Sequence, residues 1–312
     1  MAINYILPGM YENYKLNIGI GYFLKEHPEY FYDNVNINAF YGNFQFCSWD
    51  GGRVFEEYHY ATKEFIEKLK NIYNDDLKIP VRFVFTNNQI DEKICYDKYN
   101  NLVLNIFDNG MNEIAIASDI LLNYIRTNYP SYSFISSTTK CIVNGDVLKN
   151  ELQNDNYKLI CLDYNMNKAS YFLNNLPKEL KDKTEFLVNA ICPPGCPNRK
   201  EHYYLNSLFS SSYGKNYGMK DCEIYTELLI HKSKNNFSMD EIFEYEKNGF
   251  SYFKIEGRTH DAFSMMLEYM KYMVKPEYQL EVIYFLNDFI NNFDIETYDK
   301  EYLSRHFKNI IL

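Results

Sequence analysis

The chain alternates between short apolar runs and longer segments with helical spacing. Eight of the runs are rich in β-branched or aromatic residues and end at a small or polar residue, a pattern typical of buried strands. They are Ile3 to Leu7, Val35 to Phe40, Val81 to Phe85, Glu113 to Ala117, Tyr132 to Ile135, Leu159 to Leu162, Glu185 to Val188 and Phe250 to Ile255.

The segments between these runs predict helices. From Thr62 to Tyr73 the apolar residues share one face, while Lys and Glu occupy the other. Ile120 to Asn128 is a second helix, and we expect Asp119 to cap it because its carboxylate can accept from the free amides of the first turn. Further helices are expected at Asp261 to Val274, Leu280 to Phe293 and Tyr298 to Phe307.

Strand and helix alternation repeated eight times indicates an α/β fold with a parallel sheet, and eight units is the number that closes a barrel. We therefore predict a (β/α)8 TIM-like barrel over residues 1–312 as a single domain, with 275–312 as a C-terminal helical extension. A doubly wound open sheet is the alternative, but no G-x-G-x-x-G motif follows the first run.

Composition narrows the class of protein. Of the 312 residues, 24% are charged and 46% apolar, which is typical of a globular chain. No apolar run approaches the roughly 20 residues that cross a bilayer, and the start lacks the features of a signal peptide. We expect a cytoplasmic protein without a membrane segment. The net charge of −10 argues against an extensive nucleic-acid surface.

The barrel prediction indicates where an active site should lie. Active sites of such barrels lie at the carboxyl ends of the strands, so polar residues that follow the runs should surround one cavity. These residues are Asn87, Ser118, Thr138, Asp163, Asn189, Glu256 and Arg258. For Ser118, Asp119 and Thr138, an ordinary role in ending strands and capping helices remains equally open.

Two cysteines follow the seventh run in a turn rich in Pro and Gly. Cys192 and Cys196 can point both sulfurs at one ion, because proline fixes φ and glycine allows a tight turn. Cys222 lies a loop away and could return to the same place. Thiolates favour zinc or an iron–sulfur cluster, although plain structural thiols remain open.

The fourth ligand is not evident from the sequence. Cys47 lies just beyond the second run and could reach the mouth, whereas His202 is close enough to complete a zinc site. An open position that binds substrate or water is a further possibility. Cys95, Cys141 and Cys161 are expected to be small buried side chains.

The eighth run carries charges. Alternation places Lys254 and Glu256 on the same face, where buried charges must neutralise each other or a ligand. Arg258 at the rim suits a bidentate grip on a carboxylate or phosphate. A purely structural ion-pair layer is the alternative.

The segment Lys254-Ile-Glu-Gly-Arg258 resembles the K-I-E-G-R signature of the collagenase-like U-type peptidase superfamily. That superfamily includes anaerobic ubiquinone-hydroxylation and RNA-hydroxylation proteins. The resemblance implies a barrel and a [4Fe-4S] cluster, with Cys192, Cys196 and Cys222 where ligands are expected. In one branch a ligand comes from near the second strand, which makes Cys47 the fourth candidate.

The resemblance also implies a function, namely oxygen-independent hydroxylation or a related modification of an anionic or aromatic substrate. Arg258, Glu256, Lys254 and His202 are then the catalytic candidates, and the substrate is a small molecule or a macromolecule. Two alternatives stay open. One is a zinc-dependent hydrolase or peptidase, although no G-x-S-x-G or H-E-x-x-H motif is present. The other is a non-catalytic barrel that binds a protein partner.

Overall fold

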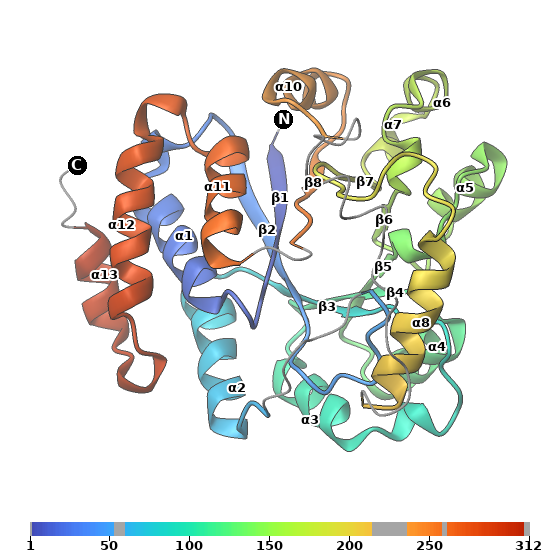
Figure 1. Cartoon of the computed structure of the whole chain (residues 1–312), viewed down its shortest axis with the longest axis horizontal. Coiled ribbons are helices and arrows are strands. Elements are labelled where there is room, and N and C mark those ends of the chain that lie inside the picture. Colours follow the sequence, from blue (N-terminus) through green and yellow to red (C-terminus); the bar gives the residue numbers. More distant parts are fainter. Residues whose placement is uncertain (1, 53–59, 214–235, 258–260, 309–312) are drawn as a thin grey trace.

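Eight parallel strands form a closed barrel. The computed structural model describes residues 2–52, 60–213, 236–257 and 261–308. Each strand pairs with its sequence neighbours, and the last pairs with the first, which confirms the predicted (β/α)8 barrel (Figure 1). The strands are β1 (Ile3–Pro8), β2 (Val35–Gly42), β3 (Val81–Phe85), β4 (Glu113–Ile116), β5 (Ser133–Ser136), β6 (Leu159–Cys161), β7 (Thr184–Leu187) and β8 (Tyr252–Lys254).

Helices follow every strand. The α-helices are α1 (Tyr14–Glu26), α2 (Lys63–Lys70), α3 (Lys98–Phe107), α4 (Asp119–Asn128), α5 (Gly145–Leu152), α6 (Ser170–Asn174), α7 (Lys178–Lys181), α8 (Arg199–Ser211), α10 (Met239–Lys247), α11 (Ala262–Met273), α12 (Gln279–Asn292) and α13 (Lys300–Lys308). A π-helical turn over Asn71–Asp76 continues α2, and short 3-10 turns lie at Pro28–Tyr30, Ile94–Tyr96, Thr138–Lys140, Tyr164–Met166, Pro276–Tyr278 and Ile295–Thr297.

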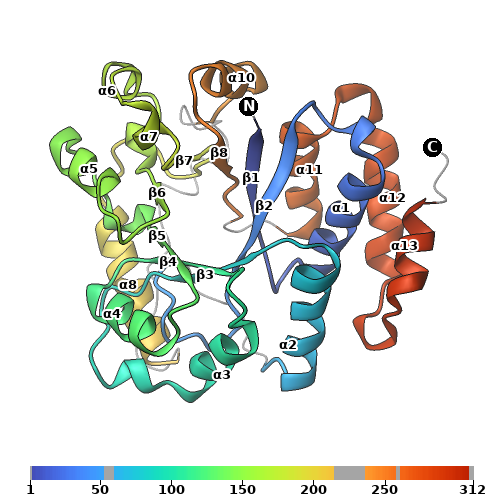
Figure 2. The same cartoon turned by 180° about the vertical axis from the view of Figure 1, so that it is seen from behind.

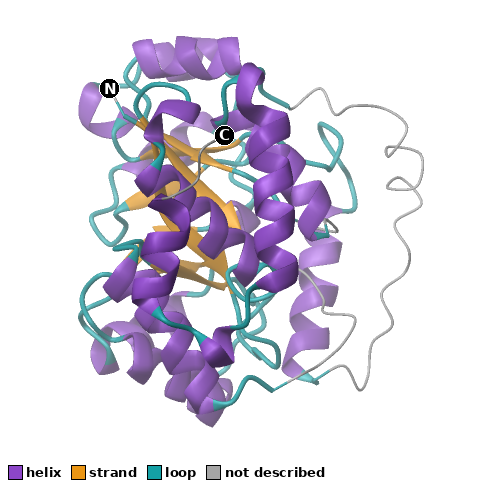
Figure 3. Cartoon of the chain, turned by 90° about the vertical axis from the view of Figure 1, so that its left-hand side faces the viewer, coloured by secondary structure: helices purple, strands orange, loops and turns teal. Residues whose placement is uncertain are grey.

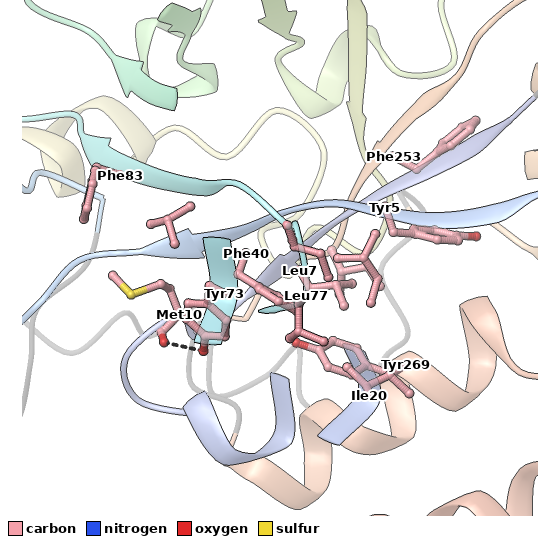
Figure 4. Close-up of a cluster of buried hydrophobic side chains, with 14 of the residues drawn as sticks. Tyr5, Leu7, Met10, Ile20, Phe40, Tyr73, Leu77, Phe83, Phe253 and Tyr269 are labelled. Carbon is pink, nitrogen blue, oxygen red and sulfur yellow. Dashed lines mark hydrogen bonds between the residues drawn. The ribbon is translucent and has the colours of Figure 1, made fainter. Parts of the chain in front are cut away.

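The alternation of side chains along the strands divides the core into two layers. Outward residues such as Phe83 and Phe253 join the large cluster between barrel and helices, part of which Figure 4 shows. Inward residues form a small separate cluster of Ala115, Ile135, Leu159 and Cys161. The barrel is therefore a packed core, and a ligand can enter only at its ends.

The cap of α4 differs from the prediction. Ser118, rather than Asp119, is the N-cap residue, and its hydroxyl accepts from the backbone N–H of Leu121. Asp119 lies in the first turn, where a carboxylate still favours the helix dipole. Ser118 therefore has a capping role, which was the ordinary alternative to a site role.

The last helices cover α1. Both α12 and α13 pack against α1, and Figures 2 and 3 show them as an outer layer on that side of the barrel. The contact is close, because a Cβ added at Gly19 would lie 3.0 Å from side-chain carbons of both Leu286 and Phe289. Within the described residues, no helix has the length and apolar character needed to span a bilayer.

Candidate active site at the barrel mouth

A cavity opens at the carboxyl ends of the strands, where the barrel fold places active sites. Its volume is about 80 Å³. The residues that line it come from β2, β3, β7, β8, helix α8 and the loops that follow the strands: Tyr41, Gly42, Asn43, Asp50, Gly52, Val84, Ser137, Thr138, Thr139, Leu187, Tyr203, Lys254, Glu256 and Gly257. Three charged side chains therefore share one small cavity.

Lys254 and Glu256 both line this cavity, as the alternation predicted. Lys254 is only 7% exposed, and its Nζ lies 4.0 Å from the centroid of the Tyr41 ring. The Tyr41 hydroxyl donates to the Ile255 carbonyl at 2.7 Å, which fixes the ring under the ammonium. Aromatic contact therefore holds the Lys254 ammonium at the cavity wall.

Glu256 is oriented by residues of the loop that follows β7. Its Oε2 accepts from the Ile191 backbone N–H at 2.9 Å, and Asn189 bonds its backbone on both sides. The ion pairs recorded among the described residues do not include one between Lys254 and Glu256, and their neutralisation by one another or by a ligand stays a prediction. The backbone N–H of Ile191 holds Glu256 Oε2 toward the loop that follows β7.

Asp50 is a site residue that the sequence analysis missed. It is buried, with Oδ1 accepting from the Gly52 backbone N–H at 2.8 Å and Oδ2 from Asn43 Nδ2 at 2.9 Å. Asn43 is anchored in turn to both backbone groups of Val84 on β3. The Asp50-Gly-Gly sequence was the available signal, because a carboxylate before two glycines is typical of a tight functional turn.

Helix α8 crosses the mouth instead of returning to the outer wall. Its first residue, Arg199, forms an ion pair with Asp163 after β6 and donates to Thr138 Oγ1 after β5 at 3.0 Å. The same guanidinium donates to the Tyr203 hydroxyl at 3.1 Å and lies 4.1 Å from the Tyr164 ring centroid. Arg199 therefore positions two residues of the cavity wall, Thr138 and Tyr203.

The far end of α8 rests on the exit of β3. The Ser207 hydroxyl accepts from the Asn88 backbone N–H at 3.1 Å, and Asn87 Nδ2 donates to Ser211 Oγ at 2.9 Å. Gly51 packs directly beneath, where a Cβ would lie 2.6 Å from Ser207 Oγ. Figures 1 and 2 show α8 on one side of the barrel, away from α1 and the C-terminal helices.

Cys192 and Cys196 lie together at the rim beside Tyr164. Both are half-buried, and Cys192 packs against the cluster of Tyr164, Leu187 and Ala190. Burial raises the pKa of Tyr164, the Arg199 charge opposes the rise, and both thiols add to it. The Tyr164 hydroxyl donates to the Pro193 carbonyl at 3.2 Å and so ties β6 to the cysteine turn.

A complete ligand set is not present in the described part of the chain. Cys222 and Arg258 lie outside the described residues, and no group of three His, Cys, Asp or Glu side chains elsewhere is placed to hold a metal ion. His202 lies on α8 and is half-buried. The whole thiolate site, Cys192 and Cys196 included, therefore stays a prediction.

Cys47 has a different environment. It is buried beside Asp50 and Asp97, and burial followed by the Asp50 charge raises the pKa of its thiol well above the usual range. A thiol surrounded by carboxylates and apolar groups is poorly suited to act as a thiolate ligand. The structure therefore offers no support for the fourth ligand that the resemblance implied.

A buried charge network lies deeper in the barrel. Arg82 on β3 donates to Glu113 Oε2 at 2.8 Å and pairs with Glu185 on β7, and all three side chains are 0% exposed. Lys158, which is 47% exposed, binds the other oxygen of Glu113 at 2.6 Å. Burial opposes ionisation of Glu113, but Arg82 and Lys158 outweigh burial and lower its pKa.

Comparison with known proteins agrees with this architecture. The chain is 26% identical over 160 residues to an uncharacterized protease of Methanocaldococcus jannaschii, a match that covers 48% of this chain and 46% of the relative. The match thus spans about half the length of that curated relative. No family model matches the chain.

A solved structure shares the fold. A U32 peptidase superposes with a TM-score of 0.50 over 82% of this chain and 93% of its own, at 11% identity. At that identity the likeness concerns the fold alone. The sequence match is therefore to a protein named as a protease, and the structural match shows the shared barrel fold.

Proposed function

We propose that this chain is an enzyme that binds an anionic group of its substrate at Lys254 in the mouth cavity. One observation carries the proposal: the Lys254 ammonium is almost fully buried, lines the cavity and takes part in no ion pair recorded among the described residues. A buried cation without a counter-ion is costly, so a bound carboxylate or phosphate would relieve that cost. The relatives named as peptidases support enzymatic activity in general.

The residues around Lys254 suit a reaction that moves a proton. Glu256 and Asp50 line the same cavity and are oriented by backbone N–H groups, so either can accept a proton from a bound substrate. Tyr203 and Thr138 also line the cavity, and Arg199 donates a hydrogen bond to the hydroxyl of each. The cavity is small, so it takes one functional group of the substrate rather than a folded polypeptide.

The anion site can be tested without knowing the substrate. Benzoate, an aromatic carboxylate, should raise the melting temperature of the wild-type protein, because a ligand that binds only the folded state stabilises it. The Lys254→Met variant should lose at least about tenfold in benzoate affinity, since an ion pair with a desolvated ammonium contributes more than about 1.4 kcal/mol. Lys63→Met, at a surface position, is the matched control. Equal binding by all three proteins would refute the proposal.

We further propose that the rim cysteines hold an iron–sulfur cluster and that the enzyme carries out oxygen-independent hydroxylation or a related modification. The position of both Cys192 and Cys196, half-buried in the turn that follows β7, supports this, together with the superfamily resemblance. Cys222 is the third proposed ligand, and the fourth position is unassigned. Such a cluster would supply electrons to a substrate bound in the cavity.

Metal analysis tests the cluster directly. Protein purified without oxygen should be brown and contain iron and acid-labile sulfide, and Cys196→Ser should lose most of both. Cys95→Ser is the matched control, because Cys95 is buried near Asp91 on the β3 side of the barrel. Zinc in place of iron would favour the hydrolase alternative, which a peptidase assay on casein would then examine. Absence of both metals after reconstitution would contradict either metal site.

A further inference from the structure

Helices α11 and α12 carry large apolar side chains on their outer surface. Each helix already turns one apolar face to the core, α11 through residues such as Met266 and α12 through residues such as Leu286. Four further apolar side chains lie outside these faces: Phe263 (54% exposed), Leu267 (45%), Leu280 (81%) and Tyr284 (77%). Packing of the core does not account for them, and apolar surface left on the outside of a helix is typical of contact with another molecule.

The four side chains form two neighbouring rows. Phe263 and Leu267 are four residues apart on α11, and Leu280 and Tyr284 are four residues apart on α12, so each pair lies on one side of its helix. The two helices pack against each other, with only the short segment around Pro276–Tyr278 between them, so they form a helical hairpin. Figure 1 shows them side by side, with α12 farther from the strands. These four residues are termed the hairpin stripe below.

Exposed apolar side chains are more scattered elsewhere in the described part of the chain. It has twelve large apolar side chains that are exposed, and the eight outside the hairpin are spread over loops and over helices α4, α5, α6 and α8. Scattered apolar residues are normal on a protein surface, whereas a contiguous group marks an interaction site. The hairpin stripe is therefore the surface that requires a partner.

The area of the hairpin stripe matches one side of a protein dimer. Its four side chains leave roughly 400–500 Å² of apolar surface in contact with water, given their exposed fractions. A standard interface buries about 800 Å² of each partner, of which about 56–65% is apolar. The stripe alone supplies that apolar share, and the polar residues at its edges would complete an interface of standard size.

The charges around the stripe favour a second copy of the chain as the partner. Lys271 is exposed one turn after Leu267 on α11, and Glu281 and Asp288 are exposed on α12. In a two-fold symmetric contact both copies present the same surface, so a surface with both signs of charge can pair its cation with a carboxylate of the other copy. The carboxylates on α12 disfavour a membrane as the partner, because anionic lipids attract clusters of Lys and Arg.

We propose that the hairpin stripe is the interface at which two copies of this chain form a dimer, with α11 and α12 of one copy packed on α11 and α12 of the other. Side chains four residues apart form the ridges that pack into the grooves of a facing helix, and two helical hairpins together make a four-helix layer. The inference goes beyond the proposed function, because no residue of the stripe lines the mouth cavity.

Sedimentation velocity of the full chain at about 1–100 μM tests the dimer, since a micromolar dissociation constant would show both species in this range. Tyr284→Glu should raise the dimer dissociation constant at least about tenfold, because each dimer would bury two added carboxylates. Leu280→Glu should have the same effect and is the second variant if Tyr284→Glu does not fold. Tyr171→Glu is the matched control, because Tyr171 is 89% exposed on α6, and it should change the dissociation constant less than about twofold.

Amide hydrogen exchange of the wild-type protein tests the same surface without a variant. Exchange in α11 and α12 should become slower as the protein concentration rises, whereas exchange in α6 should not change. Wild-type protein that stays monomeric at about 100 μM would overturn the inference, since a standard interface gives a dimer at that concentration. A dimer that withstands both stripe variants, or that Tyr171→Glu weakens equally, would also overturn it. Neither measurement involves Lys254 or a metal, so the proposed function can fail separately.

Discussion

Replacing Arg82 with methionine is expected to lower the free energy of unfolding by about 3–5 kcal/mol, which is a large part of the stability of an ordinary domain. Arg82 is 0% exposed and supplies hydrogen bonds to two carboxylates that are equally buried. Its loss leaves Glu113 with Lys158 alone and Glu185 without any ion pair recorded among the described residues. Methionine fills much of the space, so the loss reports the uncompensated charges.

Lys158→Met is the matched control for this prediction. Lys158 binds the same carboxylate, Glu113, but it is 47% exposed, so water can replace it and the cost should be below about 1 kcal/mol. Urea unfolding curves at pH 7 compare the three proteins. A loss below about 1 kcal/mol for Arg82→Met would show that the network does not hold the barrel together.

The Arg82 prediction also has a pH dependence with a definite sign. Arg82 and Lys158 lower the pKa of Glu113 in the folded state, so the stability that Glu113 contributes is present above its unfolded pKa of about 4.3 and is lost as pH falls. In Arg82→Met this contribution is already reduced. The difference in unfolding free energy between wild type and variant should therefore persist from pH 7 down to about pH 5 and shrink as the pH falls below about 4.3.

The sequence predicted the strands well because they are local features. Each observed strand falls on an apolar run, since a strand buried on its outer face needs β-branched or aromatic residues at alternate positions. The same alternation placed Lys254 and Glu256 in one cavity. The alternation did not predict which residues contact Lys254 and Glu256, because the hydrogen bonds from Tyr41 and Ile191 depend on strands far apart in sequence.

The buried charge network and the position of α8 show more clearly what the sequence could not predict. Arg82, Glu113 and Glu185 each stand in an apolar run, and a charge within a buried strand was a visible signal of pairing. Which of these charges form ion pairs depends on how the closed barrel brings the strands together, and not on their spacing in the sequence. Likewise, the position of α8 over the mouth depends on Arg199 reaching Asp163, a contact between residues 36 positions apart.

Gly51→Ala is expected to destabilise the protein by about 3 kcal/mol, at the upper end of overpacking effects. The added Cβ would lie 2.6 Å from the Thr86 carbonyl oxygen, 2.7 Å from Asn87 Cα and 2.6 Å from Ser207 Oγ. Two of these atoms belong to backbone that β3 holds in place, so the strain can be relieved only by shifting the Asp50 turn or lifting α8.

Gly52→Ala separates this close approach from a general effect of adding a methyl group to the turn. The nearest atoms to its Cβ would be Thr86 Oγ1 at 3.4 Å and Asp50 Oδ1 at 3.6 Å, ordinary contact distances. Neither glycine has a positive φ, so alanine itself is not strained at either position. Gly52→Ala should therefore stay within about 1 kcal/mol of wild type in urea unfolding.

Amide hydrogen exchange in α8 should also become faster in Gly51→Ala alone, because the helix loses its close packing against the exit of β3. Wild-type stability and exchange in Gly51→Ala would mean that α8 is not clamped to the mouth.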